Sequence, residues 1–229
     1  MIHKLSFLRA RDGLSEAEFG AYWRDVHAER FIRPLPGLRG YRMNRRVSFS
    51  AEIEEPIFHG AAELWIDDAA ADVALVRSPE YLNGVRQDEP NFLTWWATLS
   101  LNTRDHEVIA PPAGAWPGLK VFGLMKRRAG MPVAEFRQFS REVHAAKVVQ
   151  LPFVRGYVQC FVDDGHYAVS EAPLDAVSML WFDDVDGVTA AMESAEFAEV
   201  VIPTYKEFTD LRYFRTLVTD SQWLVQLGA

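Results

Sequence analysis

The first half of the chain alternates between strand-like and helix-like patterns of apolar and polar residues. Alternation across residues 5–9 predicts a β-strand. Ser15 and Glu18 then form an S-x-x-E capping box, which marks the start of a helix. Beyond it, ring-bearing side chains recur every fourth residue, at Phe19, Trp23 and His27. This spacing puts them on one face, so the pattern predicts a helix packed through that face.

The same half contains three further predicted strands and two shorter helices. Pro34, Pro36 and Gly37 end the first helix, and strands are expected at about 38–47 and 58–66. Helices are expected from about 67 and around 79–86, followed by a closing strand at 95–102. The resulting β-α-β-β-α-β order is the split βαβ arrangement of ferredoxin-like folds.

The second half of the chain repeats the first. Segment 130–147 matches segment 13–30 with eight of eighteen residues identical, where ordinary residue frequencies would give about one. After a slip of one residue the match resumes 116 positions apart, for example at Tyr41 and Tyr157 and at Trp65 and Trp181. We interpret the chain as a tandem duplication of one module.

A single module of this kind covers only one face of its sheet with helices. The other face has to be buried, and a second copy of the same sheet can bury it. We therefore expect an α+β fold in which two ferredoxin-like β-α-β-β-α-β modules form an intramolecular dimeric α+β barrel. The Pro-rich stretch 111–118 is the natural linker between a first module at 1–110 and a second at 119–229.

Composition and motifs exclude several classes of function. The formal charge of −8 gives no general affinity for nucleic acid or anionic membranes. Cys160 is the only cysteine, so neither an internal disulfide nor an all-cysteine metal site can form. The sequence has no phosphate-binding glycine loop, no H-E-x-x-H motif, no signal peptide and no span of transmembrane length. We expect a cytoplasmic protein without a metal site.

Three motifs of the first module resemble the EthD family of dimeric α+β barrel proteins. They are Phe19-x-x-Tyr22-Trp23-Arg24-Asp25-Val26-His27, Leu35-Pro-Gly-Leu-Arg-Gly-Tyr41 and Ala62-Glu-Leu-Trp65. In the second module Ser140 replaces the tryptophan and Phe153 stands in the place of Gly37, so the match is partial there. The resemblance implies two ferredoxin-like sheets closing into one barrel. Members and relatives include polyketide decarboxylases, dehydratases and cyclases, usually without a cofactor, and proteins associated with ether and aromatic-compound degradation.

The strand expected at 58–66 carries the most informative candidate residues. A period of two places His59, Glu63 and Trp65 on one face, while the other face is small or aliphatic and suits the helix-covered side. The polar face suits a ligand pocket, with His59 and Glu63 as catalytic candidates. The aligned positions of the second module are more apolar, which favours the first module as the active one.

Histidines and tyrosines at aligned positions supply further candidates. His27 can exchange a proton at physiological pH, although a histidine on an apolar helix face often only packs. Tyr41 can stabilise a developing oxyanion. The remaining predicted substrate-binding residues are Trp23, Trp65, His3, Tyr22, His144 and Tyr157.

These candidates predict a cofactor-independent enzyme of lyase or isomerase type. His27 or His59 would act as the base, with Glu63 sharing the proton. The substrate would be a small aromatic, polyketide-like or cyclic apolar molecule, and the reaction a dehydration, decarboxylation, cyclisation or isomerisation. Two alternatives remain open: a haem enzyme built on tandem ferredoxin-like modules, and a non-catalytic binding protein whose histidines only pack. Assembly of the chain into a homodimer is also left open.

Overall fold

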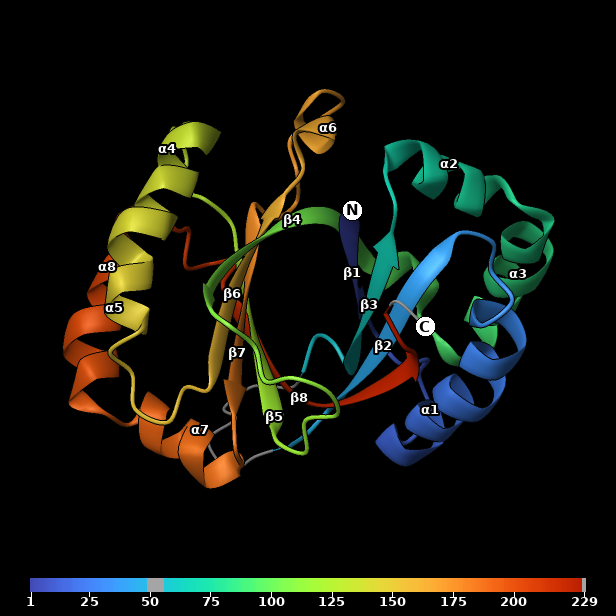
Figure 1. The fold of residues 1–229 in the computed structure, drawn as a ribbon, viewed down its shortest axis with the longest axis horizontal. Coiled ribbons are helices and arrows are strands. Elements are labelled where there is room, and N and C mark those ends of the chain that lie inside the picture. The colour runs from blue at the N-terminus through green and yellow to red at the C-terminus, as the bar shows by residue number, and fades with distance from the viewer. Residues whose placement is uncertain (49–55, 228–229) are drawn as a thin grey trace. The chain divides into compact units, whose positions relative to one another are not determined.

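The computed structural model describes residues 1–48 and 56–227 of the 229-residue chain (Figure 1). The first half follows the predicted order of elements. They are β1 (Ile2–Leu8), α1 (Glu16–Tyr22), the π-helix η1 (Trp23–Ile32), β2 (Leu38–Arg46), β3 (Gly60–Ile66), α2 (Ala69–Arg77), the π-helix η2 (Tyr81–Val85), α3 (Arg86–Phe92), the 3-10 turn η3 (Trp95–Ala97) and β4 (Leu99–Ile109). The predicted capping box is present, since Ser15 caps α1 and its N–H donates to Glu18 Oε2 at 2.9 Å.

The second half repeats this order. Its elements are β5 (Leu119–Met125), α4 (Val133–Phe139), the π-helix η4 (Ser140–His144), α5 (Ala145–Val148), β6 (Gly156–Val162), α6 (Asp164–Tyr167), β7 (Ala176–Phe182), α7 (Val185–Met192), the π-helix η5 (Glu196–Val201), α8 (Ile202–Phe208) and β8 (Arg215–Val225). Pro132 is the N-cap of α4, at the position aligned with Ser15. Among the described helices, none is long and apolar enough to cross a membrane.

The strands pair antiparallel within each half. β1 pairs with both β3 and β4, β2 pairs with β3, and β7 pairs with both β5 and β6. Over all eight strands the hydrogen-bonded order is β1-β3-β2-β8-β5-β7-β6-β4, which closes as a barrel. The predicted fold class, two ferredoxin-like modules in one α+β barrel, is confirmed.

Residue contacts divide the described chain into two compact units. The first contains 1–47, 56–103 and 220–227, and the second consists mainly of 104–219. The strands β4 and β8 therefore each begin in one unit and end in the other. In the first unit, Asp220 of β8 pairs with Arg45 of β2, and Ser221 Oγ donates to Asn44 Oδ1 at 2.6 Å. The last part of β8 thus belongs to the sheet that begins with β1.

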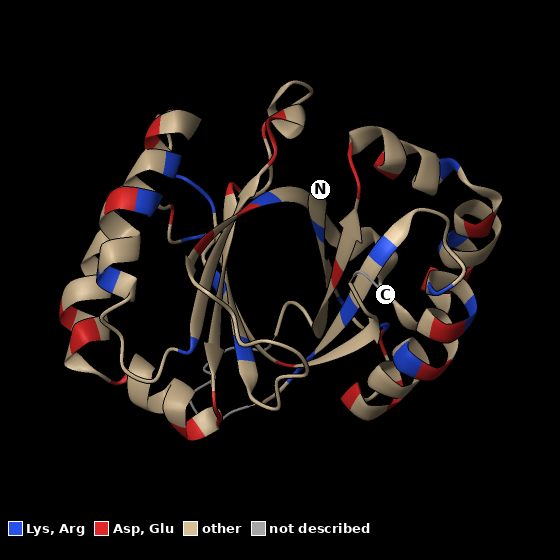
Figure 2. Ribbon diagram, viewed as in Figure 1, with Lys and Arg blue, Asp and Glu red and all other residues tan. Residues whose placement is uncertain are grey.

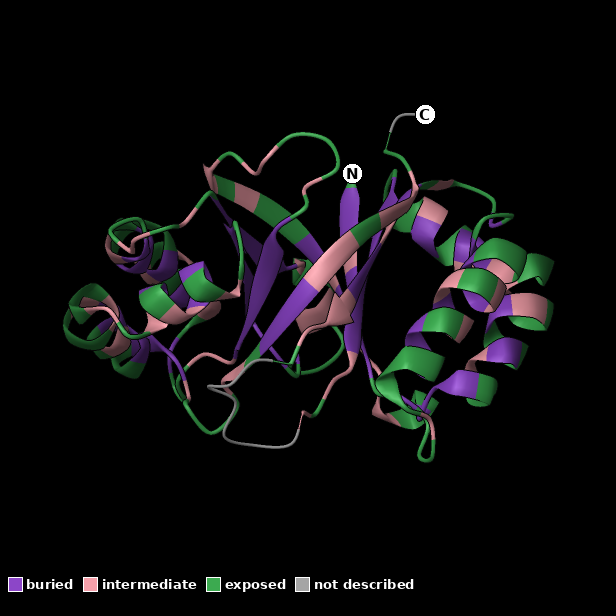
Figure 3. Ribbon diagram, turned by 90° about the horizontal axis from the view of Figure 1, so that it is seen from below, coloured by how far each residue is buried: buried purple, intermediate pink, exposed green. Residues whose placement is uncertain are grey.

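Each sheet of the first and second units is covered by helices on one face. In the first unit Ala62, Leu64 and Ile66 of β3 belong to the core under the helices, so the intervening Glu63 and Trp65 face the other way. The helices bury the side that faces their sheet and expose the outer side (Figure 3). Most charged residues lie on helices and loops (Figure 2). Apolar side chains therefore lie between each sheet and its helices, where a ligand cavity can form.

The closing strand of the first module begins later than the sequence pattern predicted. Trp95 and Trp96 belong to η3, in which Ala97 N–H donates to Thr94 O at 2.9 Å, and β4 starts only at Leu99. The two indole rings pack edge to face. Tryptophan favours strands in general, but here the local turn and ring contact override that preference. The predicted start of this strand at 95 was therefore wrong.

Candidate functional site

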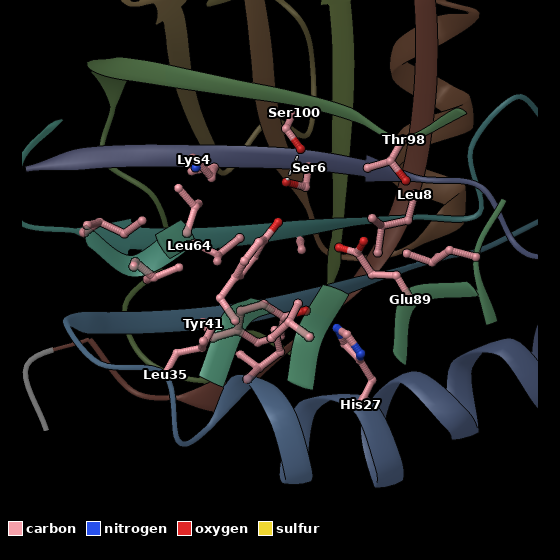
Figure 4. Close-up of a pocket in the computed structure, with 18 of the residues that line it drawn as sticks. Lys4, Ser6, Leu8, His27, Leu35, Tyr41, Leu64, Glu89, Thr98 and Ser100 are labelled. Atoms are coloured by element: carbon pink, nitrogen blue, oxygen red, sulfur yellow. Dashed lines mark hydrogen bonds between the residues drawn. The ribbon is translucent and has the colours of Figure 1, made fainter. Parts of the chain in front are cut away.

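A cavity of about 180 Å³ lies between the sheet and the helices of the first unit (Figure 4). Strands β1 to β4 and the helical segments η1, α2, η2 and α3 contribute lining residues. Much of the lining is aliphatic or aromatic. Its polar members are Lys4, Ser6, His27, Tyr41, Tyr81, Glu89, Thr98 and Ser100. The cavity therefore combines an apolar interior with a few groups able to exchange or donate protons.

His27 is held in the cavity wall by a buried carboxylate. Its Nδ1 lies 2.8 Å from Oδ2 of Asp88 on α3, and its ring packs against Phe92 with 4.6 Å between centroids. An ionised carboxylate only accepts hydrogen bonds, so His27 carries its proton on Nδ1. Asp88 does not line the cavity, whereas His27 does. The nitrogen left for a ligand is therefore Nε2, with its lone pair available as a base.

Asp88 accepts hydrogen bonds from three side chains. Besides His27, the Tyr22 hydroxyl donates to Oδ1 at 2.7 Å and Asn91 Nδ2 donates to the same oxygen at 3.1 Å. Burial by itself raises the pKa of Asp88, but the hydrogen bonds from His27, Tyr22 and Asn91 outweigh it and hold the pKa below its ordinary value. Asp88 is therefore ionised at neutral pH, where it orients His27 and can stabilise an imidazolium.

Tyr41 presents a hydroxyl to the same cavity. The indole Nε1–H of Trp23 donates to the Tyr41 oxygen at 2.7 Å, so the hydroxyl keeps its own proton to donate. Burial raises the pKa of Tyr41 above its ordinary value, and the phenol stays neutral at physiological pH. A neutral donor of this kind can stabilise negative charge that develops on a ligand oxygen.

Charged residues occupy two further parts of the cavity wall. Glu89 of α3 points into the cavity on the side of His27 (Figure 4), and its Oε2 lies 2.5 Å from Arg86 Nη1. Lys4 of β1 pairs with Asp72 of α2 at 2.5 Å. The charges of Glu89 and Lys4 are thus each balanced by a partner, while both side chains line the cavity.

The structure separates His59 from the residues with which it was grouped. β3 begins at Gly60, so His59 precedes the strand. Its Nδ1 accepts the Ala10 N–H at 3.2 Å, and its ring packs on Phe19 of α1. The alternation of a pleated strand does not extend to a residue outside it. The prediction that His59 and Glu63 share one pocket was therefore wrong.

Glu63, His3 and Trp65 lie together on the face of the sheet opposite the cavity. His3 Nε2 is 3.2 Å from Glu63 Oε2, and the His3 ring stacks on Trp65 at 4.5 Å. Asn44 Nδ2 also donates to Glu63 at 2.9 Å. None of these residues lines the cavity beside His27. The structure therefore does not bring Glu63 to His27 as the predicted proton partner.

The second unit has a cavity of about 220 Å³ at the aligned positions. Its lining carries none of the charged residues found in the first cavity. Lys4 aligns with Val121, Ser6 with Gly123 and Glu89 with Tyr205. The asymmetry predicted from the sequence concerned the third-strand face with Glu63 and Trp65, which lines neither cavity. The two cavities differ in charge at Lys4 and Glu89 instead.

His144 and Tyr157, which were predicted to bind substrate, line neither of these two cavities. His144 Nδ1 lies 2.7 Å from Thr204 Oγ1, and Thr204 occupies the position aligned with Asp88. Burial lowers the pKa of His144 to about 3. The Tyr157 hydroxyl accepts a hydrogen bond from Gln159 at 2.9 Å. These two residues are built into the core of the second unit.

The sequence patterns did not single out Asp88 and Glu89. Both lie in a helix predicted too short, since the third helical stretch was expected to end near 86 and α3 extends to Phe92. The repeat itself carried the missing signal, because the aligned positions hold Thr204 and Tyr205. The charges of Asp88 and Glu89 therefore have no counterpart in the second copy.

Comparison with protein families finds the EthD domain twice, over residues 11–94 and 128–212. The first match includes His27 and Asp88, and the second includes His144 and Thr204. No curated protein sequence matches the chain.

Several solved structures share the whole fold. An anthrone oxidase-like protein is 10% identical, with 100% of this chain and 95% of that chain covered and a TM-score of 0.71. A putative monooxygenase from Lactobacillus acidophilus NCFM is 9% identical, with coverages of 98% and 96% and a TM-score of 0.53. A mutant chlorite dismutase from Candidatus Nitrospira defluvii is 10% identical, with coverages of 95% and 89% and a TM-score of 0.52. At such identities the similarity establishes a common fold only.

Proposed function

This chain belongs to the EthD family, of which it carries two domain copies, and from this premise we propose that the first copy is an acid–base catalyst. The observation that carries the proposal is the His27–Asp88 pair, which leaves His27 Nε2 as a base in the wall of a largely apolar cavity. A positioned general base typically contributes about 10²–10⁴-fold to a reaction rate.

The size and lining of the cavity suit a small cyclic substrate that carries an oxygen at one edge. Its volume of about 180 Å³ and its aliphatic and aromatic lining suit an aromatic, polyketide-like or other cyclic apolar molecule. Tyr41 offers its hydroxyl proton to a carbonyl or phenol oxygen. Ser6 and Ser100, whose hydroxyl oxygens are 2.8 Å apart, provide further hydrogen-bonding groups on the strand side.

The proposed chemistry begins with removal of a proton from carbon. His27 Nε2 takes the proton from a carbon next to the substrate carbonyl. The electron pair of the C–H bond forms the C=C bond of an enolate, and the π pair of the carbonyl moves onto its oxygen. Tyr41 hydrogen-bonds that oxygen, and Asp88 stabilises the imidazolium. His27 then returns the proton, to a different carbon in an isomerisation or to a departing hydroxyl group in a dehydration, and the carbonyl group re-forms. These steps use protein groups alone.

Two other functions remain predictions with their own tests. A haem enzyme would show a Soret band in freshly purified protein after haem supply. A non-catalytic binding protein would hold its ligand with an affinity indifferent to pH between about 5 and 8, where imidazole titrates.

The proposal is tested by the exchange of carbon-bound protons for deuterium. The protein is incubated in D₂O with neutral cyclic ketones such as 1-indanone and 1-tetralone, and loss of the α-proton signal is followed by NMR. We expect catalysed exchange, reduced about 10²–10⁴-fold in His27→Gln and in Asp88→Asn. Soaked crystals should show the ketone beside His27.

The second copy supplies matched controls. His144→Gln and Thr204→Val change the aligned pair, which lines neither cavity, and should leave the exchange rate unchanged. The proposal is contradicted if His27→Gln and His144→Gln lose exchange equally. It is also contradicted if no ketone of the panel undergoes catalysed exchange.

A further inference from the structure

The second unit contains a cavity that the proposed reaction does not use. It measures about 220 Å³ and is lined from β5, β7, β8, α5, α7, η5 and α8 and the residues beside them. None of its lining residues, all of which are described, is Asp, Glu, Lys, Arg or His. Ser178, Tyr205 and Thr216 are the lining residues with hydroxyl groups.

These hydroxyl groups do not require a ligand to carry hydrogen-bonding groups. The Ser178 hydroxyl donates to Gly123 O at 3.4 Å within the protein. Thr216 is exposed, so it lies where the cavity reaches solvent. Water inside such a space would give up hydrogen bonds without replacing them, and apolar cavities of this kind stay dry or take apolar guests.

The cavity has kept its size while losing its charges. It is no smaller than the first cavity, although Val121 and Tyr205 stand where the first carries Lys4 and Glu89. Empty apolar space lowers stability in proportion to its volume. Larger side chains could have filled it, yet Ala191 stands at the position where the first cavity has the bulkier Leu75. An occupant that fills the space would recover the lost contacts.

We propose that the second unit binds a neutral, apolar ring molecule in this cavity, at a site separate from the proposed catalytic one. An apolar cavity of about 150 Å³ holds benzene, so about 220 Å³ suits a bicyclic ring system of the size of indole. A carboxylate or ammonium on the ligand would lose its hydration without gaining a partner. Neutral rings are therefore bound in preference to their charged analogues.

The probes are indole and its charged analogue indole-3-carboxylate, titrated by isothermal calorimetry into the full-length protein. We expect indole to bind at least about tenfold more tightly than the carboxylate. Ala191→Leu fills part of the cavity with the residue of the first copy, and Thr216→Trp blocks its exposed edge. Each should weaken indole binding by about tenfold or more. Thr216 is exposed, so its variant keeps the test valid if Ala191→Leu folds poorly.

The matched control is Ser100→Trp, because Ser100 lines the first cavity at the position aligned with Thr216. It should leave indole binding unchanged. Absence of saturable indole binding overturns the proposal, as does loss of binding in Ser100→Trp with full binding in Thr216→Trp. The readout is binding in the second unit, so it is independent of whether His27 catalyses proton exchange.

Discussion

Asp88 and Thr204 occupy aligned positions, and this one difference gives two aligned histidines different chemistry. Asp88 keeps a negative charge beside His27, whereas Thr204 offers His144 a neutral hydroxyl. Without a neighbouring charge, burial dominates and lowers the pKa of His144 to about 3. His144 is therefore neutral at physiological pH and does not act as a proton acceptor.

The lowered pKa of His144 makes the stability of the protein depend on pH. The unfolded chain takes up a proton at this residue near pH 6.5, whereas the folded chain resists protonation down to about pH 3. The contribution of His144 is therefore complete above pH 6.5 and is lost as the pH falls toward 3. We expect the free energy of unfolding to fall across this window by on the order of 1 kcal/mol per pH unit because of this residue.

Urea unfolding between pH 7.5 and pH 4 measures this dependence. His144→Gln should have a shallower slope of unfolding free energy against pH than the unchanged protein. Thr204→Val removes the hydroxyl beside the ring but keeps the titrating group, so it should retain the steep slope. Identical slopes in all three proteins would show that burial of His144 does not control the acid sensitivity.

At the scale of residues, the sequence predicted some members of the site and missed their partners. His27 and Tyr41 were predicted and do line one cavity. His59 and Glu63 were placed with them by counting along a strand, which says which residues share a face but not where the strand starts or what covers that face. Asp88 reaches His27 from another helix, 61 residues away, and such a contact is set by tertiary packing rather than by any local pattern.

At the scale of elements, the one-residue slip between the copies coincides with a change in helix type. In the first copy the π-helical run η1 extends from Trp23 to Ile32, while in the second η4 ends at His144 and the helix continues as α5. Ile32 and Val148, 116 positions apart, both line their cavities. The additional residue of the first copy is therefore taken up within η1, as a π-helix accommodates an insertion.

Deleting Arg30 tests this interpretation. Arg30 is exposed in η1, and its removal gives the first helix the length of the second, so the fold should be retained with a loss of unfolding free energy below about 2 kcal/mol. Deleting Gln138 from α4 is the control. It would turn the buried Ser140 and His144 by about 100° away from the core and should be far more destabilising. Equal losses in urea unfolding would contradict the assignment.

The order of elements could be predicted because each has a local signature, such as the Ser15 capping box or the alternation along β3. The sequence also revealed the slip between the copies. It could not reveal the π-helical geometry, because a π-helix and an α-helix carry the same pattern of apolar residues over one or two turns. The ends of α3 and the start of β4 were equally beyond local pattern.

At the scale of the whole molecule, the first unit depends on a segment distant in sequence. Asp220 pairs with Arg45, and Trp223 packs against Trp65 with 4.9 Å between ring centroids. The Arg42 guanidinium also lies 3.9 Å from the centroid of a Trp223 ring. Residues 220–227 therefore supply the first unit with an ion pair and aromatic packing that its own module lacks.

Truncation after Thr219 should loosen the first unit more than the second. Hydrogen exchange followed by mass spectrometry is expected to speed up in peptides from β1, β2 and β3, with little change in peptides from β5 and β7. Trp223→Leu, which keeps the backbone of β8, should give a smaller change in the same peptides. A uniform increase over both sheets would instead show that the two units open as one cooperative structure.

The contribution of residues 220–227 to the first unit also has a consequence during protein synthesis. A ribosome adds about 5–20 residues per second, so this segment follows Thr103 by on the order of ten seconds. Residues 104–219 are contiguous and can complete most of their contacts as they emerge. The unit whose residues are translated first is therefore completed last, and the nascent chain presents an unfinished sheet until residues 220–227 have been added.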